Sequence, residues 1–90
     1  MGSTTLSANG TSLSTLRNGE SARMLGVQGG HQMLSRLASL GFTPGARLRV
    51  IQNFGRGPII VHLRDTRIAL GRGEAAQIVV ERLAGEADDA

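Results

Sequence analysis

Residues 47–70 read RLRVIQNFGRGPIIVHLRDTRIAL, and this stretch decides the fold class. Apolar residues occupy every second position along most of it, which is typical of β-strands with one buried face. Turn-forming residues at 55–58 and 64–66 divide the stretch into three strands, at about 47–53, 59–64 and 67–70. We expect the inward-facing residues to be Leu48, Val50, Ile59, Val61, Leu63, Ile68 and Leu70.

Two further strands and one helix flank this stretch. A first strand is predicted at about 20–27 from alternation around Ala22 and Met24, and a last strand begins near Ile78. Between 31 and 40 the period changes to that of a helix, with an apolar stripe that includes Leu37 and Leu40. Gly41 then stands where a left-handed C-terminal cap is expected.

The pattern therefore predicts a mostly β protein of about five strands, with one short α-helix between the first and second strands. Five short, strongly twisted strands can curl into a small barrel that hides its edges. The barrel is expected to span residues 13–83. The small, polar residues 1–12, whose Met-Gly-Ser start resembles a cloning scar, and the acidic tail 84–90 are predicted to be disordered.

The whole chain of 90 residues is long enough for one domain. It has no Cys, so a disulfide framework and a thiolate metal site are excluded. Neither a membrane-spanning apolar run nor a secretory signal is evident, and we expect a cytoplasmic protein. The formal charge is +3 and all ten basic residues are Arg, which suits an acidic protein partner or a nucleic-acid backbone.

The residues offer little independent chemistry. The sequence contains neither a phosphate-binding loop motif nor a nucleophile elbow, so we predict that the protein is not an enzyme and binds no cofactor. His31 and His62 are the residues best suited to bind a transition metal, but they are far apart in sequence with no carboxylate placed beside them. We expect no metal site there.

The outward-facing residues of the middle strands form the candidate partner-binding surface. Aliphatic side chains beside guanidinium groups are common at protein interfaces. The alternative is that the two isoleucines pack under the helix or the N-terminal segment. The candidate residues are Arg47, Arg49, Ile51, Ile60, His62 and Arg67.

Taken in order, the motifs of residues 13–80 resemble the FeoA family of small proteins of bacterial ferrous iron uptake. The most specific stretch is Arg36-Leu37-x-x-Leu40-Gly41-Phe42-x-x-Gly45, and Pro58-Ile59-x-Val61-x-Leu63 follows it. The resemblance implies an SH3-like small barrel. The residues that match its structural motif are Gly19, Leu37, Leu40, Gly41, Gly45 and Pro58.

The same resemblance implies an accessory role, in which the protein docks on the cytosolic GTPase domain of the membrane permease FeoB. The membrane would then be reached only through that partner. The alternative is an SH3-like module that binds nucleic acid through its Arg-rich outer face. Single-strand readers usually add stacking aromatic side chains, and this chain offers only Phe42 and Phe54, so we expect no nucleic-acid partner.

Overall fold

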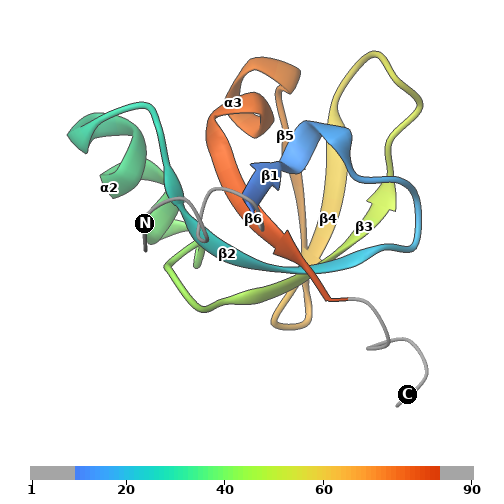
Figure 1. Cartoon of the computed structure of the whole chain (residues 1–90), viewed down its shortest axis with the longest axis horizontal. Coiled ribbons are helices and arrows are strands. Elements are labelled where there is room, and N and C mark those ends of the chain that lie inside the picture. The colour runs from blue at the N-terminus through green and yellow to red at the C-terminus, as the bar shows by residue number, and fades with distance from the viewer. Residues whose placement is uncertain (1–9, 84–90) are drawn as a thin grey trace.

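The computed structural model of the protein describes residues 10–83. The disorder predicted for residues 1–9 and 84–90 concerns segments outside the described residues. Figure 1 labels the elements that follow. In chain order they are strand β1 (Gly10–Ser12), 3-10 helix η1 (Leu13–Thr15), strand β2 (Ser21–Val27), helix α2 (His31–Ser39), strands β3 (Arg47–Gln52), β4 (Ile59–Leu63) and β5 (Thr66–Leu70), helix α3 (Arg72–Gln77) and strand β6 (Ile78–Arg82).

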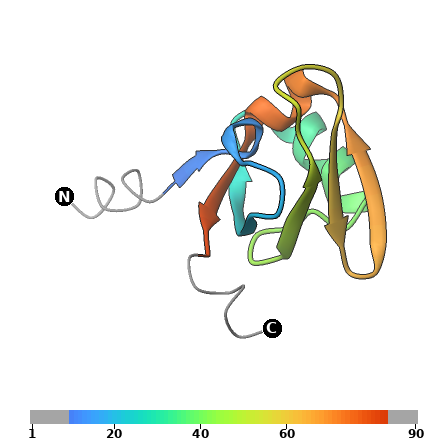
Figure 2. The same cartoon turned by 90° about the vertical axis from the view of Figure 1, so that its right-hand side faces the viewer.

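These strands form one antiparallel sheet in the order β1-β6-β2-β3-β4-β5. The sheet curves round on itself, as Figures 1 and 2 show, and η1 packs against α3 across its opening. Register shifts interrupt the β2–β6 ladder between Met24 and Gly26 and the β3–β4 ladder between Val50 and Gln52. Such bulges increase strand twist, which helps a short sheet to close into a barrel. The predicted mostly β small barrel is confirmed.

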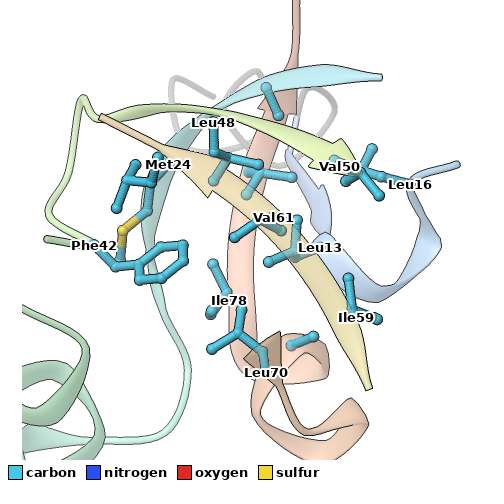
Figure 3. Packing of buried hydrophobic residues seen from close by; sticks show 14 of the residues in the cluster. Leu13, Leu16, Met24, Phe42, Leu48, Val50, Ile59, Val61, Leu70 and Ile78 are labelled. Carbon is cyan, nitrogen blue, oxygen red and sulfur yellow. The ribbon is translucent and has the colours of Figure 1, made fainter. Parts of the chain in front are cut away.

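The core inside the barrel is almost wholly aliphatic, with Phe42 lying beside Met24 (Figure 3). Nearly all of the inward positions predicted from strand alternation are buried, while Ile68 is half-buried and packs against the core. Among residues 10–83 no polar or charged residue is buried. The hydrophobic effect therefore drives this fold with few specific polar contacts inside it.

Strand β1 corrects the prediction that residues 1–12 are disordered throughout. Gly10–Ser12 pairs with β6, and the next residues form η1, which buries Leu13. The short Gly-Thr-Ser strand carries no apolar alternation, so periodicity does not reveal it. It forms because β6 presents a free edge and because burial of Leu13 and Leu16 holds the chain against that edge.

Helix α2 begins at His31 as predicted and is one residue shorter than expected at its end. The chain then leaves the helix through a Schellman motif: the Phe42 N–H donates to the Leu37 carbonyl, and the Gly41 N–H donates to the Ala38 carbonyl, each at 2.9 Å. Gly41 takes the positive φ of 101° that this motif requires.

The predicted apolar stripe of α2 is wrong at Leu40. Leu37 is fully buried, but Leu40 is 45% exposed. Leu40 is the C-cap residue, and α2 contacts the sheet chiefly through β2, so the end of the stripe does not reach the core. Figure 1 shows α2 standing beside β2, away from the other strands.

The remaining motif residues lie at turns. Gly19 precedes β2, Gly45 precedes β3, and the exposed Pro58 immediately precedes β4. Within the described residues, none of the helices is long and apolar enough to cross a membrane.

Candidate partner-binding surface

The structure brings the six candidate residues to one outer face of β3, β4 and β5. On β3 they alternate with the buried Leu48 and Val50. Across the strands, Arg49 lies opposite His62, which in turn lies opposite Arg67. The set on this face is Arg47, Arg49, Ile51, Ile60, His62 and Arg67.

The two isoleucines differ in exposure, and a cover formed by residues 1–9 lies outside the described residues. Ile51 is 39% exposed, because it is the extra residue of the β3 bulge and has no partner on β4. Ile60 is half-buried and lies opposite Gln52 on one side and Ala69 on the other. Since α2 packs along β2, neither isoleucine lies beneath it. The face therefore has a basic end and an aliphatic end.

The basic end contains an open hollow of about 290 Å³, which we call the arginine hollow. Arg64 and Asp65 of the β4–β5 turn line it, and so does Leu83, the residue that follows β6. Most of its lining residues are polar or charged, with Leu48 and Leu83 also among them. The lining residues are Ser21, Arg47, Leu48, Arg49, His62, Arg64, Asp65 and Leu83.

Ion pairing differs between this end and the rest of the described chain. Three ion pairs join Arg23 to Glu81, Arg36 to Glu74 and Arg82 to Glu20, at 3.0–3.1 Å. Within residues 10–83, no ion pair engages Arg49, Arg64 or Arg67. Among the described residues, Asp65 is the one carboxylate that lines the hollow.

The histidines do not come together. His31 is exposed at the start of α2, whereas His62 is half-buried on β4. Among residues 10–83, no three His, Cys, Asp or Glu side chains lie close enough to hold a metal ion. The geometry therefore gives no support to a metal site at either histidine.

The two aromatic residues bear on the nucleic-acid alternative. Phe42 is fully buried, so it cannot stack on a base. Phe54 is 69% exposed, but it belongs to the loop between β3 and β4, at the opposite end of β4 from the arginine hollow. No aromatic side chain lines the hollow.

Asn53 is a residue whose role the sequence analysis missed. Its side-chain amide donates to the carbonyls of Leu16 at 2.6 Å and Ser14 at 3.1 Å, and its Oδ1 accepts from Arg72 Nη2 at 2.6 Å. Its backbone N–H donates to Asn18 Oδ1 at 2.6 Å. Asn53 thus ties the end of β3 to η1 and α3. An Asn at a strand end, two residues before a glycine, suggests only a turn, so no local signal identifies these distant partners.

The fold defines a class, the small SH3-like barrel. Comparison with known proteins then gives the family. The family model described as "FeoA domain" matches residues 11–82. The chain therefore belongs to the FeoA family, as the sequence motifs indicated, and this is a family of small accessory domains and not of enzymes.

Individual relatives agree with this assignment. The chain is 36% identical over 69 residues to a protein of Methanocaldococcus jannaschii named as an Fe(2+) transport protein A, covering 77% of this chain and 83% of that protein. A crystal structure titled iron uptake regulatory protein (FeoA) superposes with a TM-score of 0.78 at 34% identity, over 82% of this chain and 99% of that one. FeoA of Stenotrophomonas maltophilia was solved with zinc and is described as a prokaryotic SH3 domain protein. It superposes with a TM-score of 0.70 at 34% identity, over 79% of this chain and 89% of that one.

Proposed function

We propose that this protein is a cytosolic accessory factor of ferrous iron uptake that binds the GTPase domain of a FeoB-type permease and modulates its transport or nucleotide cycle. Membership of the FeoA family supports the link to iron transport. The relatives' names refer to iron transport and uptake, and the described residues group no metal ligands.

The observation that carries the docking role is the outer face of β3–β5. Within residues 10–83, no helix or strand covers the two isoleucines and the arginines of this face, although the core beneath them is closed. Interfaces commonly combine an apolar centre with guanidinium groups at the edge. The face extends over three neighbouring strands, so it presents a rigid surface to a folded partner.

Binding to the purified GTPase domain tests the proposal. The full chain is immobilised, and the GTPase domain is applied without nucleotide, with GDP and with a non-hydrolysable GTP analogue. We expect retention in at least one of these states and a changed GTP hydrolysis rate when both proteins are mixed. Lack of binding in every state, together with normal iron uptake after deletion of the gene, would refute the proposed function.

A further inference from the structure

We propose that the arginine hollow is a receptor for an acidic, extended peptide segment of the partner protein. In this arrangement an Asp or Glu side chain enters the hollow between Arg49 and Arg64, and an aliphatic side chain of the same segment lies over Ile60. The inference rests on the proposed function for the identity of the partner, but the chemistry of the hollow is argued independently of it.

The first argument is the row of basic side chains across the sheet. Arg49 and Arg67 both lie opposite His62, one on each neighbouring strand, and Arg23 faces Arg47 on the β2–β3 ladder. Like charges directly opposite each other destabilise a sheet, as for Arg23 and Arg47. Arg23 is paired with Glu81, but no carboxylate in residues 10–83 pairs with Arg49 or Arg67. A carboxylate bound from outside offsets the positive charge that Arg49 and Arg67 add to this face.

The second argument is the turn that carries Arg64 to the rim of the hollow. The two-residue turn between Leu63 and Thr66 has Arg64 at φ 50° and Asp65 at φ 67°. Positive φ at both positions is the geometry of a type I′ hairpin, which prefers Asn or Gly. Arg64 is the unfavoured residue in this turn, and it lines the hollow. The fold thus tolerates local strain at a position where the side chain suits a ligand.

The third argument decides between an acidic peptide and a nucleic acid. No aromatic side chain lines the hollow, so it offers no base-stacking surface. The aliphatic Ile60 is two residues from His62 on β4, a separation of roughly 7 Å along a strand. In an extended peptide, residues two apart project to the same side at this same spacing. A segment with an acidic residue and an aliphatic residue at positions i and i+2 therefore matches the face.

The test measures both binding and stability in a small set of full-length variants. The ligands are the GTPase domain of the permease and poly-L-glutamate, with single-stranded polyuridylate as the nucleic-acid comparison. Arg49→Glu reverses a charge in the hollow, and Arg56→Glu makes the same change in the exposed β3–β4 loop as the matched control. Arg64→Asn places a residue that favours positive φ in the turn.

We expect Arg49→Glu to weaken binding of both acidic ligands by about tenfold or more, as for the loss of a charge-assisted hydrogen bond. Arg56→Glu should weaken the binding of these ligands far less. Arg64→Asn should weaken binding while the melting temperature stays the same or rises. If Arg64 had only a structural role, its replacement would not lower binding and preserve stability at the same time. On adding poly-L-glutamate, amide resonances of residues 47–49 and 62–65 should shift.

The outcomes separate the two proposals. If wild type binds the GTPase domain and Arg49→Glu binds it as well as Arg56→Glu does, the hollow is not the receptor, although the proposed function stands. If wild type binds poly-L-glutamate through the hollow but no GTPase domain in any state, the receptor stands and the partner is wrong. Tighter binding of polyuridylate than of poly-L-glutamate at the same residues would overturn the peptide assignment.

Discussion

Asn53 shows how much one side chain contributes to this small barrel. Each polar atom of its amide is used: Nδ2 donates twice, and Oδ1 accepts from Arg72 and from the Gly55 N–H. The carbonyls of Ser14 and Leu16 that receive these bonds are part of the segment around η1, which packs on α3. Removal of the amide leaves partly buried acceptors without a donor, which costs more than the bonds alone.

We therefore expect Asn53→Ala to lower the free energy of unfolding by about 1–3 kcal/mol. Asn53→Asp keeps the acceptor for Arg72 and Gly55 but loses both donors to Ser14 and Leu16, so it should also destabilise the protein. Chemical denaturation of the two variants measures the difference. Stability equal to wild type in both variants would show that the contacts of Asn53 are replaced by water without cost.

Period-two alternation predicts which residues face inward, because successive side chains of a strand point to opposite faces of the sheet. Leu48, Val50 and Val61 were predictable from their neighbours alone, and all three are fully or almost fully buried. Asn53 was not predictable, because its partners lie 19–39 residues away in sequence. Only the folded topology brings them together.

At the level of the element, α2 is held by its C-terminal cap as well as by the buried Leu37 of its apolar stripe. The Schellman bonds from Phe42 and Gly41 close the helix end, and Phe42 and Leu37 are both fully buried. A Cβ added at Gly41 would lie 3.0 Å from Leu63 Cδ2, at a φ that only glycine adopts readily. The most specific part of the sequence motif therefore encodes a helix end and its attachment to the barrel.

Two leucines of the same helix should respond very differently to truncation. We expect Leu37→Ala to lower the free energy of unfolding by about 2–5 kcal/mol, because it leaves a cavity in a closed core. The matched variant Leu40→Ala removes a side chain that is 45% exposed and should cost well under that. Thermal or chemical unfolding of the pair checks the prediction. Similar losses in both variants would mean that Leu40 packs more tightly than its exposure indicates.

Not every element of the fold can be predicted from a local sequence pattern. The helix boundary and the strands of residues 47–70 follow from periodicity and from turn residues, whereas β1 has neither. Its backbone pairing with β6 is a property of the assembled sheet, as is the bulge that leaves Ile51 without a partner on β4. Edge strands that are held by one neighbour and by burial elsewhere are invisible to a local pattern.

At the scale of the whole molecule, charge and topology together define the candidate site. The sequence predicted an Arg-rich face, since six residues alternate outward on strands expected to be neighbours. It did not predict the arginine hollow, because Arg64 and Leu83 reach it from the β4–β5 turn and from the residue after β6. The formal charge of +3 also understates the basicity of the face, because three of the seven acids follow Leu83 in sequence.

This charge distribution predicts how association with an acidic ligand depends on salt. Glu86, Asp88 and Asp89 come three to six residues after Leu83, which lines the hollow, so we expect their charges to oppose the approach of an acidic segment. Changing them to Gln, Asn and Asn raises the formal charge by three without changing the length of the chain. We expect faster association and tighter binding of poly-L-glutamate at low salt, measured by stopped-flow fluorescence or by calorimetry.

The gain should shrink as salt is added, since the screening length falls from about 10 Å at 0.1 M to about 3 Å at 1 M. The same three substitutions combined with Arg49→Glu provide the control, because a hollow with reversed charge has little attraction left to enhance. A gain that persists unchanged at 1 M salt, or that survives in the Arg49→Glu background, would contradict an electrostatic origin in the arginine hollow. It would assign the effect to some other surface of the molecule.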